Sequence, residues 1–235
     1  MSRIIFNFTE NMGRMNIAGN IAKIKKSLPE KVRLVAVSKT KPNEDILDAY
    51  NAGHKVFGEN KIQELVQKYE QLPKDIEWHF IGHPQTNKVK FIAPFVHLIH
   101  GVDSMKLLKV IDSEAKKNHR EIACLLQFHI AEEDTKFGLT LNEAREILDN
   151  NEFKSLNNVV IAGVMGMATY TENSEQIRNE FKLINAIFKA LKNEYFSKLK
   201  KFTEISMGMS DDYQIAVEEG STLIRIGSKI FGERN

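Results

Sequence analysis

The stretch LVAVSKTKP, residues 34–42, decides the fold of this chain of 235 residues. Its first four residues form a continuous apolar run, which is typical of a parallel strand buried on both faces. An open doubly wound α/β sheet usually carries a glycine-rich phosphate loop directly after its first strand. This stretch contains no glycine, and Lys39 stands where that loop would begin. The stretch therefore favours a closed parallel barrel over the open sheet.

Seven further apolar runs follow, and segments with helical spacing separate them. The predicted strands are residues 32–38, 55–57, 78–81, 98–102, 122–130, 159–165, 202–206 and 223–226. A helix precedes the first of them, because Ile17, Ile21 and Ile24 form one apolar stripe. Strict alternation of strand and helix implies parallel strands joined by right-handed crossovers. We therefore expect an α/β fold, a (β/α)8 TIM barrel with an extra N-terminal helix, as one domain over residues 1–235.

Composition and charge exclude several classes of function. Lys and Arg total 33 against 31 Asp and Glu, so the net charge of +2 supports neither nucleic-acid binding nor a polybasic membrane surface. The one cysteine, Cys124, rules out an intramolecular disulfide and agrees with a reducing compartment. No apolar run reaches the roughly 18 residues of a spanning helix, and charges interrupt the N-terminal segment where a signal peptide would be apolar. We expect a cytoplasmic monomer.

In a barrel of this kind the functional site forms at the carboxyl ends of the strands. The residues predicted there are unusually polar: Lys39, Glu59, Asn60, Gly82, His83, Asp103, His129, Met165, Met167, Ser206, Arg225, Gly227 and Ser228. Ser206 and Ser228 offer hydroxyls in the loops after the last two strands, where neighbouring glycines leave backbone N–H groups unhindered. The same residues would also serve as helix-capping turns. The pairing of the two loops favours a phosphate monoester as ligand.

Two cationic residues stand in apolar strands. Lys39 alternates with Val35 and Val37, and burial would favour the neutral amine that forms a Schiff base. Alternation alone leaves open whether that face lies inside the barrel or in solvent. Arg225 needs a carboxylate, a phosphate or a ring nitrogen as partner, and a structural ion pair would satisfy it equally well.

Other polar residues carry less information. Glu59 and Asn60 either contact the ligand or cap the helix that follows them. The histidine spacings, such as that from His79 to His83, match no helical zinc pair, so we predict no metal site. Cys124 lies within an apolar run and is interpreted as a core residue rather than a nucleophile.

The ordered motifs of the chain closely resemble those of the pyridoxal phosphate homeostasis proteins, which are single-domain barrels similar to the N-terminal domain of alanine racemase. The matching stretches cover nearly the whole chain: residues 34–42, 57–60, 78–82, 85–88, 163–167, 206–212 and 224–232. Pro84 and the pair Phe128–His129 depart from the family pattern, which weakens the comparison at the third and fifth strand ends.

The resemblance implies a pyridoxal 5'-phosphate site made of six residues: Lys39, Asn60, Ser206, Arg225, Gly227 and Ser228. Lys39 would hold the cofactor as an internal aldimine, and Arg225 would face its pyridine nitrogen. Ser206, Gly227 and Ser228 would bind the phosphate, and Asn60 would lie beside the ring. The resemblance assigns no catalytic residue.

An arginine at the pyridine nitrogen has a functional consequence. Because its charge is permanent, it opposes protonation of the nitrogen and weakens the ring as an electron sink. The resemblance therefore implies a carrier without robust catalysis, which buffers pyridoxal phosphate and delivers it to apo-enzymes. One alternative is an amino-acid racemase or lyase with Lys39 as one base and His83 or His129 as the other. Another is a barrel enzyme that binds a sugar phosphate through a Lys39 Schiff base.

Overall fold

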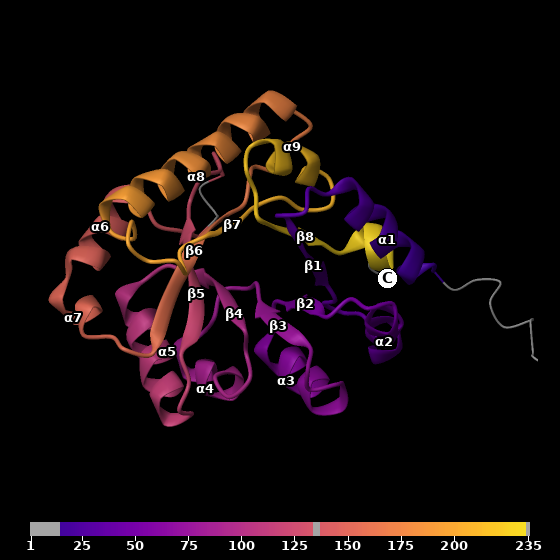
Figure 1. Ribbon diagram of the computed structural model, residues 1–235, viewed down its shortest axis with the longest axis horizontal. Helices are drawn as coiled ribbons and strands as arrows, with labels where there is room; N and C mark the ends of the chain where they lie inside the picture. The colour runs from indigo at the N-terminus through magenta and orange to yellow at the C-terminus, as the bar shows by residue number, and fades with distance from the viewer. Residues whose placement is uncertain (1–14, 134–136, 234–235) are drawn as a thin grey trace, which may run out of the picture.

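The apolar run at residues 34–37 belongs to the first strand of a closed parallel barrel. The structure is a computed structural model that describes residues 15–133 and 137–233 (Figure 1). Each strand pairs in parallel with the next along the chain, and β8 pairs with β1 to close the barrel. The strands are β1 (Arg33–Val37), β2 (Val56–Glu59), β3 (Glu77–Phe80), β4 (Leu98–Val102), β5 (Ile122–Phe128), β6 (Val159–Gly166), β7 (Glu204–Ser206) and β8 (Leu223–Ile226). The predicted barrel is confirmed.

Helices surround the strands on the outside of the barrel (Figure 1). They are α1 (Ile17–Ser27), α2 (Asn43–Asn51), α3 (Ile62–Gln71), η1 (Thr86–Lys88), α4 (Val89–Ile92), α5 (Met105–Lys117), α6 (Leu141–Asp149), α7 (Asn151–Lys154), α8 (Ser174–Glu194), α9 (Tyr213–Glu218) and α10 (Ser228–Phe231). The longer helices follow the predicted apolar spacing, whereas η1, α4, α7, α9 and α10 have too few residues to show a period. Within the described ranges, no helix is long and apolar enough to cross a membrane.

The extra helix α1 packs beside α10 (Figure 1). The Asn16 side chain caps α1 by accepting a hydrogen bond from the Gly19 N–H at 2.9 Å. The Asn20 amide donates to the Ile230 carbonyl at 3.1 Å, which joins α1 to α10. Residues 1–14 of the predicted domain lie outside the described residues.

The two faces of β1 pack into different layers. Leu34 and Ala36 belong to the core between strands and helices, whereas Val35 packs inside the barrel. Lys39 continues the inner face, and the Ser38 hydroxyl turns to the outer side, toward α3. The structure thus decides the orientation that alternation alone left open, because it places Lys39 inside the barrel opening.

Candidate functional site

A cavity of about 440 Å³ opens at the carboxyl ends of the strands. We call it the mouth cavity, and its wall comes from the ends of β1, β2, β3, β6, β7 and β8 and the loops that follow them. Segments from both halves of the chain therefore meet at one place, as the strand-end argument predicts. The volume lies in the range of small-molecule sites.

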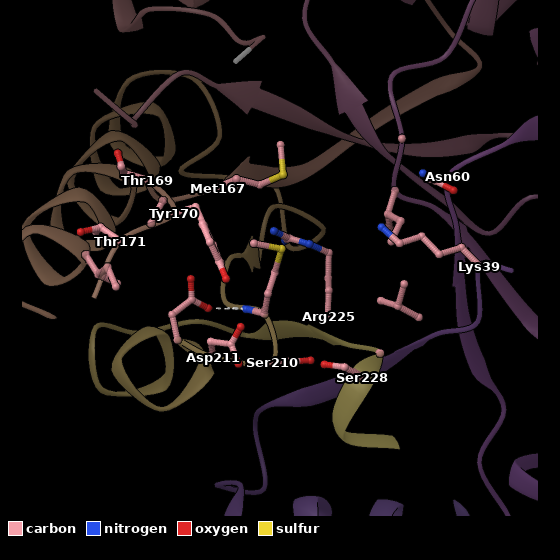
Figure 2. Close-up of a pocket in the computed structure, with 18 of the residues that line it drawn as sticks. Lys39, Asn60, Met167, Thr169, Tyr170, Thr171, Ser210, Asp211, Arg225 and Ser228 are labelled. Carbon is pink, nitrogen blue, oxygen red and sulfur yellow. Dashed lines mark hydrogen bonds between the residues drawn. The ribbon is translucent and has the colours of Figure 1, made fainter. Parts of the chain in front are cut away.

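Five of the six predicted cofactor-contacting residues line the mouth cavity: Lys39, Asn60, Arg225, Gly227 and Ser228. Figure 2 shows the Lys39 amine extending toward the Arg225 guanidinium, which belongs to the neighbouring strand β8. Ser228 lies below them, at the start of α10. The chain thus brings an amine, a guanidinium and a hydroxyl into one small space, and their contacts with a cofactor remain predictions.

Ser206, the sixth predicted residue, lies beneath the mouth cavity and is not part of its wall. It is fully buried, and its hydroxyl oxygen accepts a hydrogen bond from Arg225 Nη1 at 2.5 Å. His100 Nδ1 lies 2.9 Å from the same oxygen. The hydroxyl therefore holds two buried side chains, and a direct phosphate contact by Ser206 remains a prediction.

Ser210 provides the hydroxyl that the loop after β7 offers to the cavity. Figure 2 shows the oxygens of Ser210 and Ser228 facing each other at the cavity floor. The loop reaches this position through Gly208, whose φ of +93° is in the left-handed region, and a Cβ there would lie 2.5 Å from that of Ala216. The matching stretch 206–212 contains both serines, but nothing in the sequence showed which one lines the cavity.

A chain of buried polar groups extends from Arg225 into the barrel interior. Beyond Ser206 and His100, His79 Nδ1 lies 3.0 Å from His100 Nε2. Burial holds the pKa of both imidazoles well below the ordinary value, so both rings are uncharged at neutral pH. The interior of such barrels is usually filled by branched apolar side chains. The polar chain instead supports the side chain of Arg225 from below.

The Arg225 guanidinium is buried, and its bonds go to uncharged oxygens. It donates to Ser206 and, from Nη2, to the Gly166 carbonyl at 3.2 Å. Desolvation lowers the pKa of Arg225 to about 10, and the nearby Asp212 carboxylate acts in the opposite direction. Among the described residues Arg225 forms no ion pair, so the structural ion pair considered above is not found.

Of the other strand-end candidates, Gly82 and Met167 line the mouth cavity, whereas the charged and imidazole side chains do not. The Glu59 carboxylate is buried on the outer side of β2, where it accepts a hydrogen bond from the Ser38 hydroxyl at 2.6 Å. His83 Nδ1 lies 3.2 Å from Asp103 Oδ2, and His129 Nε2 lies 2.9 Å from the Glu133 carbonyl. Neither histidine is part of the cavity wall. The first turn of α3 has no side-chain cap, so neither Glu59 nor Asn60 caps that helix.

One group of potential metal ligands lies at the opposite end of the barrel. Ligand atoms of Glu77, His79 and His97 are within 4.8 Å of one another. Arg33 already donates to Glu77 Oε2 at 2.6 Å, so a cation would compete with a guanidinium for this carboxylate. The absence of a metal site therefore remains a prediction. Cys124 is buried, and burial raises the pKa of its thiol, as expected for a core residue.

Comparison with known proteins places these features in a family. The family model described as the alanine racemase N-terminal domain matches residues 14–235. A pyridoxal phosphate homeostasis protein of Aquifex aeolicus is 41% identical over 203 residues, which cover 86% of this chain and 87% of that protein. The human protein of this name is 38% identical over 216 residues, covering 86% of this chain and 77% of that protein.

A solved structure agrees with these relatives. PipY of Synechococcus elongatus, solved with pyridoxal phosphate bound, superposes with a TM-score of 0.83 at 34% identity, over 92% of this chain and all of PipY. The range that the family model matches includes every segment that lines the mouth cavity. The chain therefore belongs to the pyridoxal phosphate homeostasis protein family, whose barrel is that of the alanine racemase N-terminal domain.

Proposed function

We propose that this protein holds pyridoxal 5'-phosphate covalently through Lys39, buffers it in the cytoplasm and delivers it to apo-enzymes, without robust catalysis of its own. One observation carries the proposal: the Lys39 amine and the Ser210 and Ser228 hydroxyls line one cavity together with Arg225, although they come from loops after different strands (Figure 2). Membership of a family in which PipY binds pyridoxal phosphate supports it.

The donors of the mouth cavity fit the chemistry of this cofactor. An aldehyde requires an amine, and a phosphate monoester requires hydroxyl and backbone N–H donors. Lys39 offers the first, and Ser210, Gly227 and Ser228 offer the second from the loops after β7 and β8. A Cβ on Gly227 would lie 3.2 Å from the Val37 carbonyl, so a larger residue would crowd the strand that carries Lys39. The residues present therefore suit the cofactor.

The residues around the cavity favour binding over catalysis. When bound, pyridoxal phosphate supplies a reactive aldehyde and a ring that stabilises carbanions if its nitrogen is protonated. Arg225 is held by Ser206 and Gly166, and its charge disfavours that protonation. The histidines considered as a second base lie outside the cavity wall. Tyr170 lines the cavity but is 88% exposed, so water reaches this side of the site.

Trapping of the lysine adduct tests the binding proposal. Purified protein is mixed with pyridoxal phosphate, reduced with borohydride and digested, and the modified peptide is located by mass spectrometry. We expect the label on Lys39, and no visible absorbance band in Lys39→Ala. Lys41→Ala is the matched control, because Lys41 lines the same cavity while its amine donates to the Glu233 carbonyl at 2.9 Å. A label on Lys41, or colourless wild-type protein, would overturn the proposal.

Two further measurements separate the carrier from an enzyme. Loaded protein should reactivate a pyridoxal-phosphate-dependent apo-enzyme, and the loss of its absorbance should follow that gain of activity. Exchange of α-deuterium from amino acids should remain slow. Exchange at enzyme-like rates that is lost in Lys39→Ala would instead establish a racemase or lyase. Light scattering tests the proposal that the protein is a monomer.

A further inference from the structure

The residues on both sides of Lys39 are anchored to groups outside the mouth cavity. Lys39 lies between Ser38 and Thr40, in the turn that leaves β1. The anchoring groups are Glu59 at the end of β2 and Glu64 and Lys68 on α3. None of these three side chains is part of the cavity wall, so they do not touch the ligand in the proposed function.

Ser38 is held by its hydroxyl and by its carbonyl. The hydroxyl donates to Glu59 Oε1 at 2.6 Å, and the carbonyl accepts a hydrogen bond from Lys68 Nζ at 2.8 Å. The same ammonium donates to Glu59 Oε1 at 2.8 Å. Glu59 is fully buried and Lys68 is 5% exposed, so these charge-assisted bonds are shielded from water.

Thr40 is held by its backbone N–H. This group donates to Glu64 Oε1 at 2.6 Å, and Lys68 donates to the same carboxylate oxygen at 2.6 Å. Thr40 has a φ of +65°, a left-handed conformation that costs a β-branched residue energy. The bond to Glu64 offsets that cost. Lys68 therefore links the anchor of Ser38 to the anchor of Thr40, one residue on each side of Lys39.

We propose that Glu59, Glu64 and Lys68 form a positioning clamp that fixes the turn around Lys39 and so sets how readily its amine attacks an aldehyde in the mouth cavity. The inference rests on the proposed function, because it assigns Lys39 as the reacting amine. The clamp acts on the backbone at Ser38 and Thr40, whereas the phosphate end of the cavity is built by the loops after β7 and β8. Loss of the clamp should therefore change amine reactivity without changing phosphate binding.

Glu64 is the residue to change first. In Glu64→Leu the Thr40 N–H loses its acceptor, while Lys68 keeps its bonds to Glu59 and Ser38. Glu64→Gln retains a side-chain oxygen that accepts from Thr40, so it should restore the wild-type behaviour. The matched control is Glu114→Leu, since Glu114 pairs with a lysine on its own helix at 2.7 Å and its side chain is 17% exposed, against 21% for Glu64.

Two ligands separate reactivity from phosphate binding. Unphosphorylated pyridoxal reports the amine alone, and pyridoxine 5'-phosphate, which has no aldehyde, reports the phosphate end alone. In Glu64→Leu we expect the rate of adduct formation with pyridoxal to fall about 10- to 100-fold, as for a reacting group displaced by about 1 Å. The dissociation constant of pyridoxine 5'-phosphate should not change. Glu64→Gln and Glu114→Leu should react at the wild-type rate.

Amide hydrogen exchange tests the clamp without any ligand. Exchange at Thr40 should be faster in Glu64→Leu than in the wild type, the Gln variant or the Glu114→Leu control. A wild-type rate with pyridoxal in Glu64→Leu, and also in folded Lys68→Met, would overturn the inference. Equal losses for pyridoxal and for pyridoxine 5'-phosphate would also overturn it, because they indicate general damage. If wild-type protein forms no Lys39 adduct at all, the proposed function fails, and the exchange of Thr40 still decides whether the backbone anchor exists.

Discussion

Removal of the Ser206 hydroxyl separates its structural role from the phosphate contact predicted for it. In Ser206→Ala, Arg225 Nη1 and His100 Nδ1 lose a common partner that is itself fully buried. A buried polar group left without a partner costs about 1–3 kcal/mol, and a charged group costs more. Two such groups predict a loss of about 2–6 kcal/mol in the free energy of unfolding, against about 5–15 kcal/mol for a typical domain.

The assay is urea unfolding of the cofactor-free protein, followed by circular dichroism. Ser221→Ala is the matched control, because Ser221 is a buried serine whose hydroxyl donates only to backbone carbonyls, with Met207 O at 2.8 Å. This control should lose about 1 kcal/mol, the net value of one ordinary hydrogen bond. Ser206→Ala should therefore be clearly the less stable of the two variants.

Binding of two ligands to Ser206→Ala completes the test. If Ser206 acts by holding Arg225, which lies between the amine and the phosphate loops, affinity should fall equally for pyridoxal phosphate and for unphosphorylated pyridoxal. If Ser206 contacts the phosphate directly, affinity should fall for the phosphorylated ligand alone. A variant as stable as the Ser221→Ala control that loses only the phosphorylated ligand would refute the structural role and establish the direct contact.

Three other outcomes follow from the geometry. Ser210→Ala and Ser228→Ala should each weaken pyridoxal phosphate binding by about 1.5–3 kcal/mol, measured by absorbance titration, and leave pyridoxal binding unchanged; equal losses for both ligands would contradict a phosphate contact. Gly208→Ala should weaken binding in the same phosphate-selective way, because a Cβ there forces the Ser210 loop to move; unchanged affinity would contradict this. Burial lowers the pKa of His54 to about 4, so folded protein binds fewer protons than unfolded protein below the ordinary value of 6.5. The free energy of unfolding should therefore be unaffected by His54 above pH 6.5 and should fall by about 3 kcal/mol as the pH drops from 6.5 toward 4. In His54→Asn this part of the fall should be missing, so the plot of unfolding free energy against pH should be flatter on its acid side. Parallel plots for the variant and the wild type would contradict the assignment.

Much of the barrel could be predicted because its signal is local. The strands at residues 98–102 and 223–226 have the predicted bounds, since each is a short, mainly apolar run that follows a polar residue. The strand predicted at 202–206 begins later, at Glu204, because strand pairing starts only there. The residues at strand ends could also be predicted, because the fold itself brings those ends together.

The orientation of Lys39 could not be predicted from alternation, because both faces of β1 are apolar. Leu34 and Ala36 pack under helices while Val35 packs inside the barrel, so the two faces look alike in the sequence. Which serine of the stretch 206–212 lines the cavity could not be predicted for another reason. It depends on the left-handed turn at Gly208, which moves the second serine over the cavity and leaves the first below it.

The side chains of the positioning clamp are the hardest to predict, because their hydrogen-bond partners come from neighbouring strands and helices. Glu64 and Lys68 are four residues apart on α3, a spacing that in the sequence indicates an ordinary solvated helix pair. Only the packing of α3 against β1 and β2 turns this pair toward Ser38 and Thr40. The residues that line the cavity of such a barrel can therefore be predicted from the ends of its strands. The residues that set their reactivity can be identified only when the strand order and the helix packing are known. The comparison of Glu64→Leu with Glu114→Leu measures that difference directly, because two similar helix pairs should differ in effect only through the backbone that one of them holds.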